Sequence, residues 1–390
     1  MLFAACVLLV ASAPDTSFVA RVADATNPTR ADARFAAGWL AADKRPLLEL
    51  TSTTRPRPAL PAGPHVVLAN GDRIPGTLAA ADELGVTVKT NLYAWRIPLA
   101  QVRVAWLSAP AAETPDGIDR YAWLAPNRTR DTLLLRNGDI RSGDLARLSD
   151  DARQLMWTPA DGPATNFDAN RVAALATNPN LVSNRKLKGS FARAVLTNGA
   201  RVTLLSAESD GIRLRGTTAF GAKFDLALEN LVALQVFQAQ ATYLSSLTPA
   251  KLESTAYADL AWPMQLDRSA RNQPLRLRTA RGVETFDNGL GTHPRTRVSF
   301  DLAGKHRTLE ALVGLDAVTG KQGAARVTVL VDDQDRTPDA LRNLTSAAEA
   351  FSLRIDVAGA KRLTLVVDFA PAGDAHADVN WANARLIDEK

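Results

Sequence analysis

An Asn-Gly pair preceded by a run of apolar residues occurs three times in this chain, at 70–71, 137–138 and 198–199. The three copies read VVLANGDRIPGTL, LLLRNGDIRSGDL and AVLTNGARVTLLS. Asn-Gly between alternating apolar residues is a strong hairpin signal, because both residues tolerate the positive φ of a type I′ turn. The pattern therefore predicts three β-hairpins with type I′ turns, spaced 67 and 61 residues apart.

Each predicted hairpin is followed by the same series of strand-like segments. The first copy continues with GVTVKT and WRIPLAQVRVAWL, the second with RQLMWTP and NFDANRVAALA, and the third with GIRLRGT and KFDLALENLVALQVF. Equal order and near-equal length indicate a repeated module of about five short strands. We predict repeats at 65–107, 130–176 and 192–237, each loosely resembling a small SH3-like or Sm-like barrel.

The segment 14–64 is less regular than the repeats that follow it. Its stretch ADARFAAGWLAAD predicts either a short helix or a degenerate fourth repeat. The next stretch, TSTTRPRPALPAGP, is rich in proline, which interrupts both helices and central strands. We predict that this second stretch is a linker.

From about residue 243 onward the strands become longer and alternate cleanly between apolar and polar residues. Examples are RVSFDLAG, RVTVLVDD, FSLRIDVAG and RLTLVVDF, which are separated by turns rich in Gly, Asp and Pro. Alternation with a period of two over many strands is typical of antiparallel sheets with one buried face. The segment 243–390 is therefore predicted to be an antiparallel β-sandwich, and the whole chain to be all-β.

Composition and the N-terminus indicate an exported globular protein. The chain has 46% hydrophobic and 22% charged residues, as ordinary globular proteins do. Residues 1–13 form an apolar run that ends in Ala-Ser-Ala and resembles a secretory signal peptide, and no other stretch is apolar enough to span a membrane. Cys6, the single cysteine, lies in this run, so the rest of the chain has no disulfide or thiolate chemistry. We expect a secreted, periplasmic or cell-envelope location.

Several C-terminal segments occur in the order typical of one known family. They are YLSSL at 243–247, LDRS at 266–269, NGLGTHPRTRVSFDLAG at 288–304, LEALVGLDA at 309–317, RVTVLVDDQ at 326–334, IDVAGAKRLTLVVDFA at 355–370 and DAHADVNWANARLI at 374–387. With these segments, the region from 243 to about 387 resembles the NPCBM family of carbohydrate-binding modules. The resemblance implies a jelly-roll β-sandwich of the galactose-binding type, often attached to glycoside hydrolases, and a glycan as the ligand.

Three residues of this region are candidates for contact with a ligand. His293 follows the two glycines of GLGTH, which permit backbone dihedrals closed to other residues. It caps a strand end, contacts a sugar hydroxyl, or serves as a metal ligand or catalytic group. Trp262, beside a proline in a predicted loop, is the stronger candidate for stacking on a sugar ring. Trp381 is in phase with both apolar and polar residues, and it either packs in the core or stacks on the ligand.

Five aspartates are candidate ligands of a structural Ca²⁺, which the resemblance to galactose-binding-type sandwiches suggests. Asp374 and Asp378 flank His376 in DAHAD, where the alternation of an extended strand would place all three side chains on one face. The alternative ligands, at the ends of predicted strands, are Asp316, Asp332 and Asp333. Solvation of an exposed charged loop is the competing interpretation of these residues.

No catalytic machinery is recognisable in the sequence. A glycosidase needs two carboxylates on a large scaffold, and a (β/α)₈ barrel takes about 250 residues, for which the repeats and the sandwich leave no room. The motifs G-x-S-x-G and H-E-x-x-H and the P-loop do not occur, and the four histidines are scattered at 65, 293, 306 and 376. We therefore expect a noncatalytic protein.

Two functional hypotheses follow from these features. In the first, the C-terminal sandwich of an exported protein binds a glycan, and the repeats are a spacer or an interaction platform. In the second, the chain is a structural or scaffolding protein of the cell envelope, and the sandwich binds a protein partner. Nucleic acid is not an expected partner, although Sm-like barrels would allow it, because the net charge of +5 comes from interspersed basic residues with few aromatic neighbours.

Overall fold

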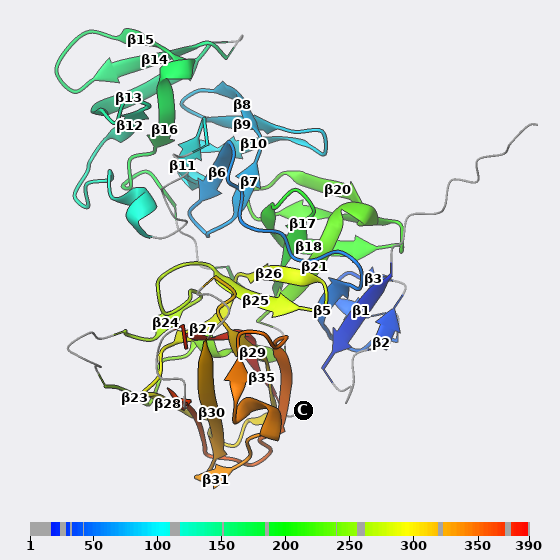
Figure 1. Ribbon diagram of the computed structural model, residues 1–390. Coiled ribbons are helices and arrows are strands. Elements are labelled where there is room, and N and C mark those ends of the chain that lie inside the picture. The colour runs from blue at the N-terminus through cyan, green and yellow to red at the C-terminus, as the bar shows by residue number, and fades with distance from the viewer. Residues whose placement is uncertain are drawn as a thin grey trace, which may run out of the picture.

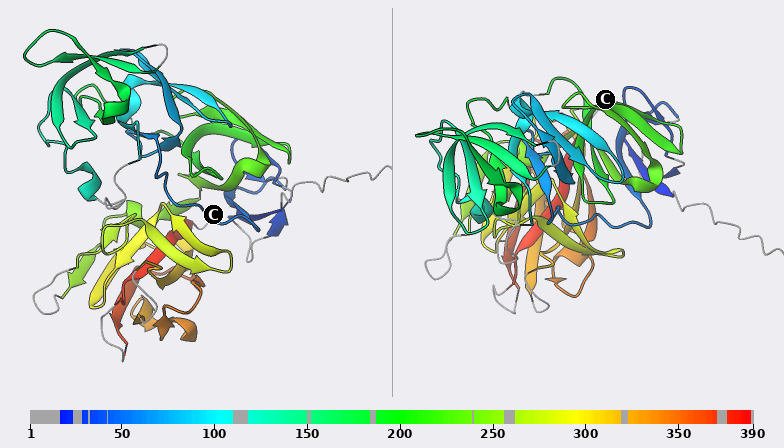
Figure 2. Two further views of the ribbon diagram at one scale, coloured as in Figure 1. Left: turned by 45° about the horizontal axis from the view of Figure 1, so that its top comes forward. Right: turned by 90° about the horizontal axis from the view of Figure 1, so that it is seen from above.

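The computed structural model describes residues 17–23, 29–31, 33–41, 43–109, 118–149, 152–183, 187–238, 240–255, 262–318, 323–370 and 376–388. This part of the chain is all-β, as predicted, with short 3₁₀ helices between strands. The repeats lie on one side of the molecule and the C-terminal sandwich on the other (Figures 1 and 2). The predicted signal segment 1–13 falls outside the described residues. No helix among the described residues has the length and apolarity needed to cross a membrane.

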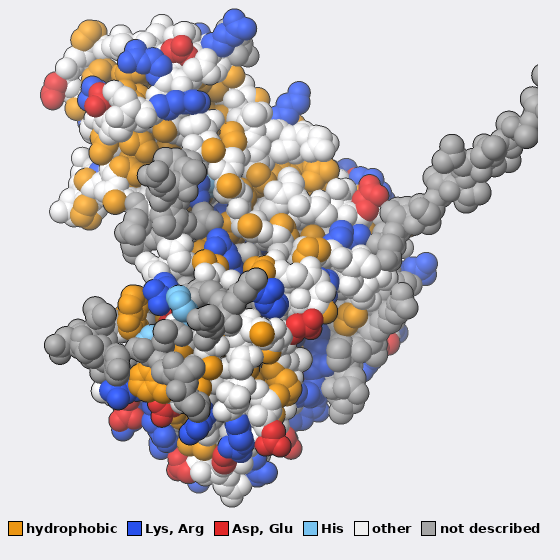
Figure 3. Space-filling view, in the orientation of Figure 1, with side chains coloured by type: hydrophobic (Ala, Val, Ile, Leu, Met, Phe, Trp, Pro, Cys, Tyr) orange, Lys and Arg blue, Asp and Glu red, His pale blue; other side chains and the backbone are white. Residues whose placement is uncertain are grey.

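Basic side chains do not gather into one strip on the face seen in Figure 3. Lysines and arginines are spread over both the repeats and the sandwich, between patches of neutral and acidic side chains. This distribution matches the interspersed charges of the sequence.

The segment before the first repeat is built from short strands. They are β1 (Phe18–Val22), β2 (Thr29–Ala31), β3 (Phe35–Ala36), β4 (Leu40–Ala41) and β5 (Leu47–Ser52). β1 pairs antiparallel with β2 and β5, and β3 pairs with β4. The helix alternative for ADARFAAGWLAAD is therefore wrong. Gly38 and Trp39 have φ of 79° and 62° in the β3–β4 turn, and a right-handed helix cannot contain such dihedrals.

The three repeat segments share one order of elements. The first contains β6 (His65–Leu68), β7 (Arg73–Pro75), β8 (Thr77–Ala81), β9 (Gly85–Lys89), β10 (Ala94–Pro98), η1 (Leu99–Gln101) and β11 (Val102–Trp106). After η2 (Ile118–Tyr121), the second contains β12 (Asp131–Leu135), β13 (Ile140–Leu148), β14 (Gln154–Pro159), β15 (Thr165–Asp168), η3 (Ala169–Arg171) and β16 (Val172–Ala176). The third contains β17 (Phe191–Leu196), β18 (Arg201–Ser209), β19 (Arg213–Thr218), β20 (Lys223–Ala227), η4 (Leu228–Asn230) and β21 (Leu231–Phe237).

In each segment the strand after the 3₁₀ helix returns to the first strand. β11 pairs with β6, β16 with β12 and β21 with β17. The same antiparallel closure thus occurs three times. The resemblance of these segments to SH3-like or Sm-like barrels stays a prediction.

The three Asn-Gly hairpins form, but with a different turn from the predicted one. Gly71, Gly138 and Gly199 have φ of 86°, 87° and 87°, whereas the asparagines before them are not in the positive-φ region. The Asn70 Oδ1 atom accepts a hydrogen bond from the backbone N–H of Asp72 at 3.0 Å, and the other two asparagines make the same contact. The prediction of type I′ turns is wrong because this side-chain contact favours a type I turn closed by a glycine bulge.

Residues 17–238, which we call the repeat body, form one continuous unit. β5 pairs with β21, and β11 pairs with β16, so that neighbouring segments share sheets. The carboxylate of Asp72 in the first repeat accepts hydrogen bonds from the N–H and hydroxyl of Thr203 in the third, at 2.7 and 2.6 Å. One cluster of buried apolar side chains extends from Phe18 to Val236 through all these segments.

The proline-rich stretch 51–64 of the repeat body packs between the third repeat and the C-terminal sandwich. Arg57 is 2% exposed, and its backbone N–H donates to Glu284 Oε2 at 3.1 Å. Close by, Arg201 of the third repeat forms an ion pair with Asp287 of the sandwich at 3.2 Å. The stretch therefore fixes the two halves of the molecule together, and it is not a free linker.

The C-terminal region contains two facing antiparallel sheets, which confirms the predicted β-sandwich. One, the β35 sheet, contains β22 (Ala241–Tyr243), β24 (Gln265–Leu266), β27 (Gly289–Thr292), β29 (His306–Leu315), β33 (Phe351–Asp356) and β35 (Val379–Asp388). The other, the β34 sheet, contains β23 (Lys251–Ser254), β28 (Thr296–Asp301), β30 (Ala324–Val331), β31 (Gln334–Asp335), β32 (Leu344–Thr345) and β34 (Arg362–Phe369). The remaining elements are the hairpin β25 (Leu275–Thr279)–β26 (Gly282–Phe286), η5 (Leu244–Ser246) and η6 (Asp339–Leu341).

Alternation along the strands separates the sandwich core from its outer faces. Phe300, Val329 and Leu365 of the β34 sheet and Leu353 of the β35 sheet are buried between the sheets. Residues at the intervening positions of the β35 sheet point outward, toward the repeat body. This outer face carries polar side chains such as Asn383 and Arg385 beside apolar ones such as Leu312, Ala382 and Ile387, and it forms part of the junction between the two halves.

Candidate functional site

Two strand ends bring His293 and Asp378 together. β27 ends at Thr292, which lies opposite Val379, the first residue of β35. The residue after β27 and the residue before β35 are consequently neighbours, because the two strands are antiparallel. The His293 Nδ1 atom lies 2.6 Å from Asp378 Oδ1, and both side chains are buried.

Arg271 binds the other oxygen of the same carboxylate. Its Nε–H donates to Asp378 Oδ2 at 2.6 Å, and 41% of the Arg271 side chain is exposed. The loop that carries Arg271 crosses β27 directly over Gly291, where an added Cβ would lie 2.3 Å from the Arg268 carbonyl oxygen. The second glycine of GLGTH is therefore needed for this loop to approach the strand.

The charge on Asp378 decides which nitrogen of His293 carries the proton. Burial by itself would raise the pKa of Asp378, but the hydrogen bonds from His293 and Arg271 outweigh burial and hold the pKa below its ordinary value. An ionised carboxylate only accepts, so Nδ1 of His293 is the donor. Nε2 is then an acceptor when the ring is neutral and a donor when the ring is protonated. This atom is buried and has no hydrogen-bond partner among the described residues.

Trp262 lies beside this pair and remains partly exposed. Its ring centroid is 5.8 Å from that of His293, and the guanidinium carbon of Arg271 lies 5.0 Å from the centroid of the indole. We call Trp262, Arg271, His293 and Asp378 the Trp262 site. It presents an aromatic ring, a partly exposed cation and one ring nitrogen without a partner among the described residues, a set suited to a ligand with both apolar and hydroxyl-bearing faces.

Comparison with known families identifies the domain that carries this site. The model of the NPCBM/NEW2 domain matches residues 240–387. This part of the chain is an NPCBM/NEW2 domain. A curated protein of Renibacterium salmoninarum named "Putative endo-alpha-N-acetylgalactosaminidase" is 25% identical over 161 residues, which are 37% of this chain and 10% of that protein. The chain thus spans about a tenth of the length of that relative.

Two solved structures similar to this chain contain CBM51 modules of Clostridium perfringens. The CBM51 of GH95 in complex with methyl-galactose is 23% identical and covers 37% of this chain and 99% of its own, with a TM-score of 0.34. The CBM51-2 and INT domains of ZmpB in complex with GlcNAc are 22% identical and cover 48% of this chain and 40% of their own, also with a TM-score of 0.34. Similarities this distant do not establish what this chain binds. We therefore infer the function of the site in the NPCBM/NEW2 domain from its own side chains.

The structure brings three of the residues singled out in the sequence into one site, and it adds a fourth. Trp262, His293 and Asp378 meet although they are far apart in the chain. The sequence analysis did not identify Arg271. No spacing or periodicity marks this arginine, because its importance comes from a loop that crosses β27.

Trp381 is not available to a ligand, which corrects its candidacy for stacking. The side chain is 0% exposed, lies in the sandwich core and donates from Nε1 to Thr292 Oγ1 at 3.1 Å. β35 is an inner strand between β27 and β29, and Trp381 is on its inward side. Of the two alternatives for this residue, core packing is the one that the structure shows.

The candidate metal ligands do not form one cluster. Asp332 and Asp333 occupy the two-residue turn between β30 and β31, with φ of 48° and 64°, and the Asp332 carboxylate accepts from the backbone N–H of Arg362 at 2.8 Å. Asp316 is next to the Trp262 site, where its backbone N–H donates to the Asp378 carbonyl at 2.9 Å. Asp374 falls outside the described residues. Within these, no three His, Cys, Asp or Glu side chains gather to hold a metal, and a Ca²⁺ site that includes Asp374 stays a prediction.

The ionised state of Asp378 makes the stability of the domain depend on pH. A carboxyl group whose pKa is lower in the folded state stabilises the fold above its unfolded pKa, and this stabilisation is lost as the pH falls through the folded pKa. We expect the free energy of unfolding of the full chain, measured with urea, to fall between about pH 5 and about pH 2. This decrease in the free energy of unfolding should be smaller in Asp378→Asn than in the wild type. In the control Asp333→Asn it should equal that of the wild type. An equal fall in Asp378→Asn and the wild type would contradict this role of Asp378.

Proposed function

We propose that this chain is an exported, noncatalytic glycan-binding protein and that its NPCBM/NEW2 domain holds a sugar at the Trp262 site. The observation that carries the proposal is the partly exposed Trp262 ring next to the unpartnered Nε2 atom of His293. Sugar recognition combines an aromatic face against the apolar face of a pyranose with directional hydrogen bonds to its hydroxyls. The Trp262 site offers both.

The polar groups of the site are placed before any ligand arrives. A buried polar atom without a partner costs about 1–3 kcal/mol, and a sugar hydroxyl, which can donate or accept, removes this cost when it bonds His293 Nε2. The exposed N–H groups of Arg271 are donors for the oxygens of the same sugar. Because Asp378 binds both His293 and Arg271, it holds these two side chains in place. Little conformational entropy is therefore lost when a ligand binds.

The carboxylates of the site support binding rather than hydrolysis. A glycosidase needs an acid and a second carboxylate that flank the bond to be broken. Both oxygens of Asp378 are engaged by His293 and Arg271. Asp316, the neighbouring carboxyl group, is buried and accepts from the backbone N–H of Val318 at 3.1 Å. Neither group is placed to exchange a proton with a ligand.

The repeat body acts in this proposal as a spacer or interaction platform for the binding domain. Its packing against the sandwich through the stretch 51–64 supports this role, because it holds the domain in a defined orientation. Export, and with it a secreted, periplasmic or cell-envelope location, is proposed from the apolar run at 1–13.

Replacing Trp262 tests the proposal on the full chain. We expect isothermal titration with methyl-galactose and GlcNAc to show binding of at least one sugar, weakened at least about tenfold in Trp262→Ala, which is ~1.4 kcal/mol. Trp123→Ala is the matched control, since Trp123 is also partly exposed but belongs to the repeat body. Equal affinities of Trp262→Ala and the wild type would contradict the site. Absence of binding by the wild type would favour the scaffolding hypothesis instead.

A further inference from the structure

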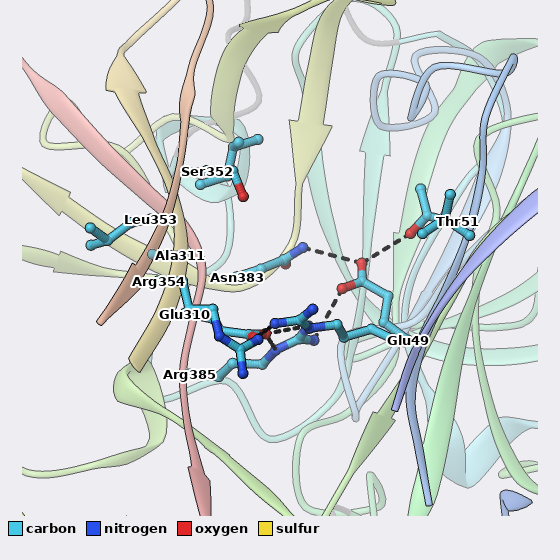
Figure 4. A pocket seen from close by; sticks show the side chains of 12 residues that line it. Glu49, Thr51, Glu310, Ala311, Ser352, Leu353, Arg354, Asn383 and Arg385 are labelled. Carbon is cyan, nitrogen blue, oxygen red and sulfur yellow. Dashed lines mark hydrogen bonds and ion pairs between the residues drawn. The ribbon is translucent and has the colours of Figure 1, made fainter. Parts of the chain in front are cut away.

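A cavity of about 350 Å³ opens between the repeat body and the outer face of the β35 sheet (Figure 4). One wall comes from β1 and β5, and the other comes from β29, β33 and β35. None of its lining residues belongs to the Trp262 site. Its volume falls in the range of about 300 to 1,000 Å³ that is usual for small-molecule sites.

The charges around this cavity do not balance. Three arginines and two glutamates line it, namely Arg21, Arg354, Arg385, Glu49 and Glu310. Three positive charges against two negative charges leave an excess of one among the lining residues. Charges withdrawn from water need compensation, so the surplus favours an anion in the cavity.

Arginines already surround both glutamates. Glu310 Oε1 lies 2.7 Å from Arg354 Nη1, Glu310 Oε2 lies 3.1 Å from Arg385 Nη2, and Arg21 pairs with the same carboxylate. Glu49 in turn pairs with Arg385 at 3.0 Å and with Arg57. Two carboxylates shared in this way cannot neutralise the three guanidinium groups that line the cavity.

Arg354 is the member of the cluster best placed to meet a ligand. It lines the cavity, and 29% of its side chain is exposed, against 5% for Arg385. The described residues give Arg354 one ion-pair partner, Glu310, so several of its five N–H donors remain available. Burial, and then the neighbouring charge of Arg385, lowers the pKa of Arg354, and an anion would relieve this repulsion.

Neutral polar groups complete the cavity. The side chains of Ser352, Asn383 and Thr51 line it, and Figure 4 shows Ser352 across the cavity from Thr51. No aromatic side chain occurs among the described residues that line it, so recognition here depends on charge and hydrogen bonds rather than on stacking. We infer that the cavity binds a sugar acid, a pyranose whose carboxylate pairs with Arg354 and Arg21 while Ser352 bonds one of its hydroxyls.

The test is isothermal titration of the full chain with glucuronate, with glucose and acetate as the neutral and the small-anion probes. We expect glucuronate to bind at least about tenfold more tightly than either probe. Arg354→Gln should weaken this binding at least tenfold, and Ser352→Ala, an exposed position with little risk to folding, about threefold. Arg362→Gln, an exposed arginine of the other sheet, should leave it unchanged.

The Trp262→Ala variant separates this cavity from the Trp262 site. Glucuronate binding that survives Trp262→Ala and is lost in Arg354→Gln supports the inference, whatever the outcome with neutral sugars. Three results overturn it: no binding of glucuronate, equal binding of glucose, or equal binding of acetate. Loss of glucuronate binding in Trp262→Ala alone would also overturn it, because the ligand would then occupy the Trp262 site.

Discussion

Replacing Gly291 by alanine will lower the free energy of unfolding of the full chain by about 3 kcal/mol, because the added Cβ has no room. It would lie 2.3 Å from the Arg268 carbonyl oxygen, 2.4 Å from the Ser269 carbonyl carbon and 2.5 Å from the Ala270 nitrogen. All three are backbone atoms, so a change of rotamer cannot relieve the contact, and the loop must move. Since this loop carries Arg271, sugar binding should weaken together with stability.

Urea unfolding measures the loss of stability, and Gly63→Ala is its control. A Cβ at Gly63 would meet nothing within 4 Å, and the φ of this residue is not in the positive region. We expect Gly63→Ala to change the free energy of unfolding by no more than about 0.5 kcal/mol. If Gly291→Ala were as stable as Gly63→Ala, the close crossing of the loop over β27 would be wrong.

Replacing Glu310 by glutamine should cost about 3–5 kcal/mol of stability, as expected when one partner of a buried ion pair is removed. The Glu310 side chain is 10% exposed and pairs with Arg21, Arg354 and Arg385. Glutamine has nearly the same shape but no charge, so three guanidinium groups would lose their shared counter-charge. The effect should be large because Arg21 belongs to the repeat body and the other residues to the sandwich.

The control for Glu310→Gln is Glu253→Gln in β23. Glu253 is exposed, and its partner Lys251 is exposed as well, so water screens the pair and its removal should leave the unfolding transition where it is. The free energy of unfolding of both variants is measured by urea unfolding followed by tryptophan fluorescence. Similar small changes in the two variants would show that the cluster at the junction contributes no stability.

The sandwich could be predicted because its signal is local. In RVSFDL and RLTLVV every second residue is apolar, and these residues lie between the two sheets. The hairpins were predictable for the same reason. Their turn type could not be predicted. It depends on the hydrogen bond from the backbone N–H of Asp72 to the Asn70 side chain, and the residue types Asn and Gly alone do not show whether this bond forms.

The Trp262 site was only partly predictable, because its geometry is tertiary. His293 and Trp262 could be singled out by residue type and by a glycine-rich neighbourhood. Asp378 entered the prediction as a metal ligand, whereas in the structure it holds His293 and Arg271. The pairing of β27 with β35 joins residues 85 positions apart, and no pattern within either segment encodes that contact.

The cluster between the two halves could not be predicted at all. Glu49 and Glu310 come from different halves of the molecule. In the sequence, each resembles an ordinary polar residue of a strand that alternates between apolar and polar positions. Only the packing of the repeat body on the β35 sheet turns these surface positions into a buried junction.

A glycan array probed with the full chain, Trp262→Ala and Trp123→Ala is the most direct test of glycan binding at the Trp262 site. We predict that the wild type and Trp123→Ala bind the same neutral glycans and that Trp262→Ala loses this binding. Binding of the same glycans by all three proteins, or by none of them, would contradict glycan recognition at the Trp262 site.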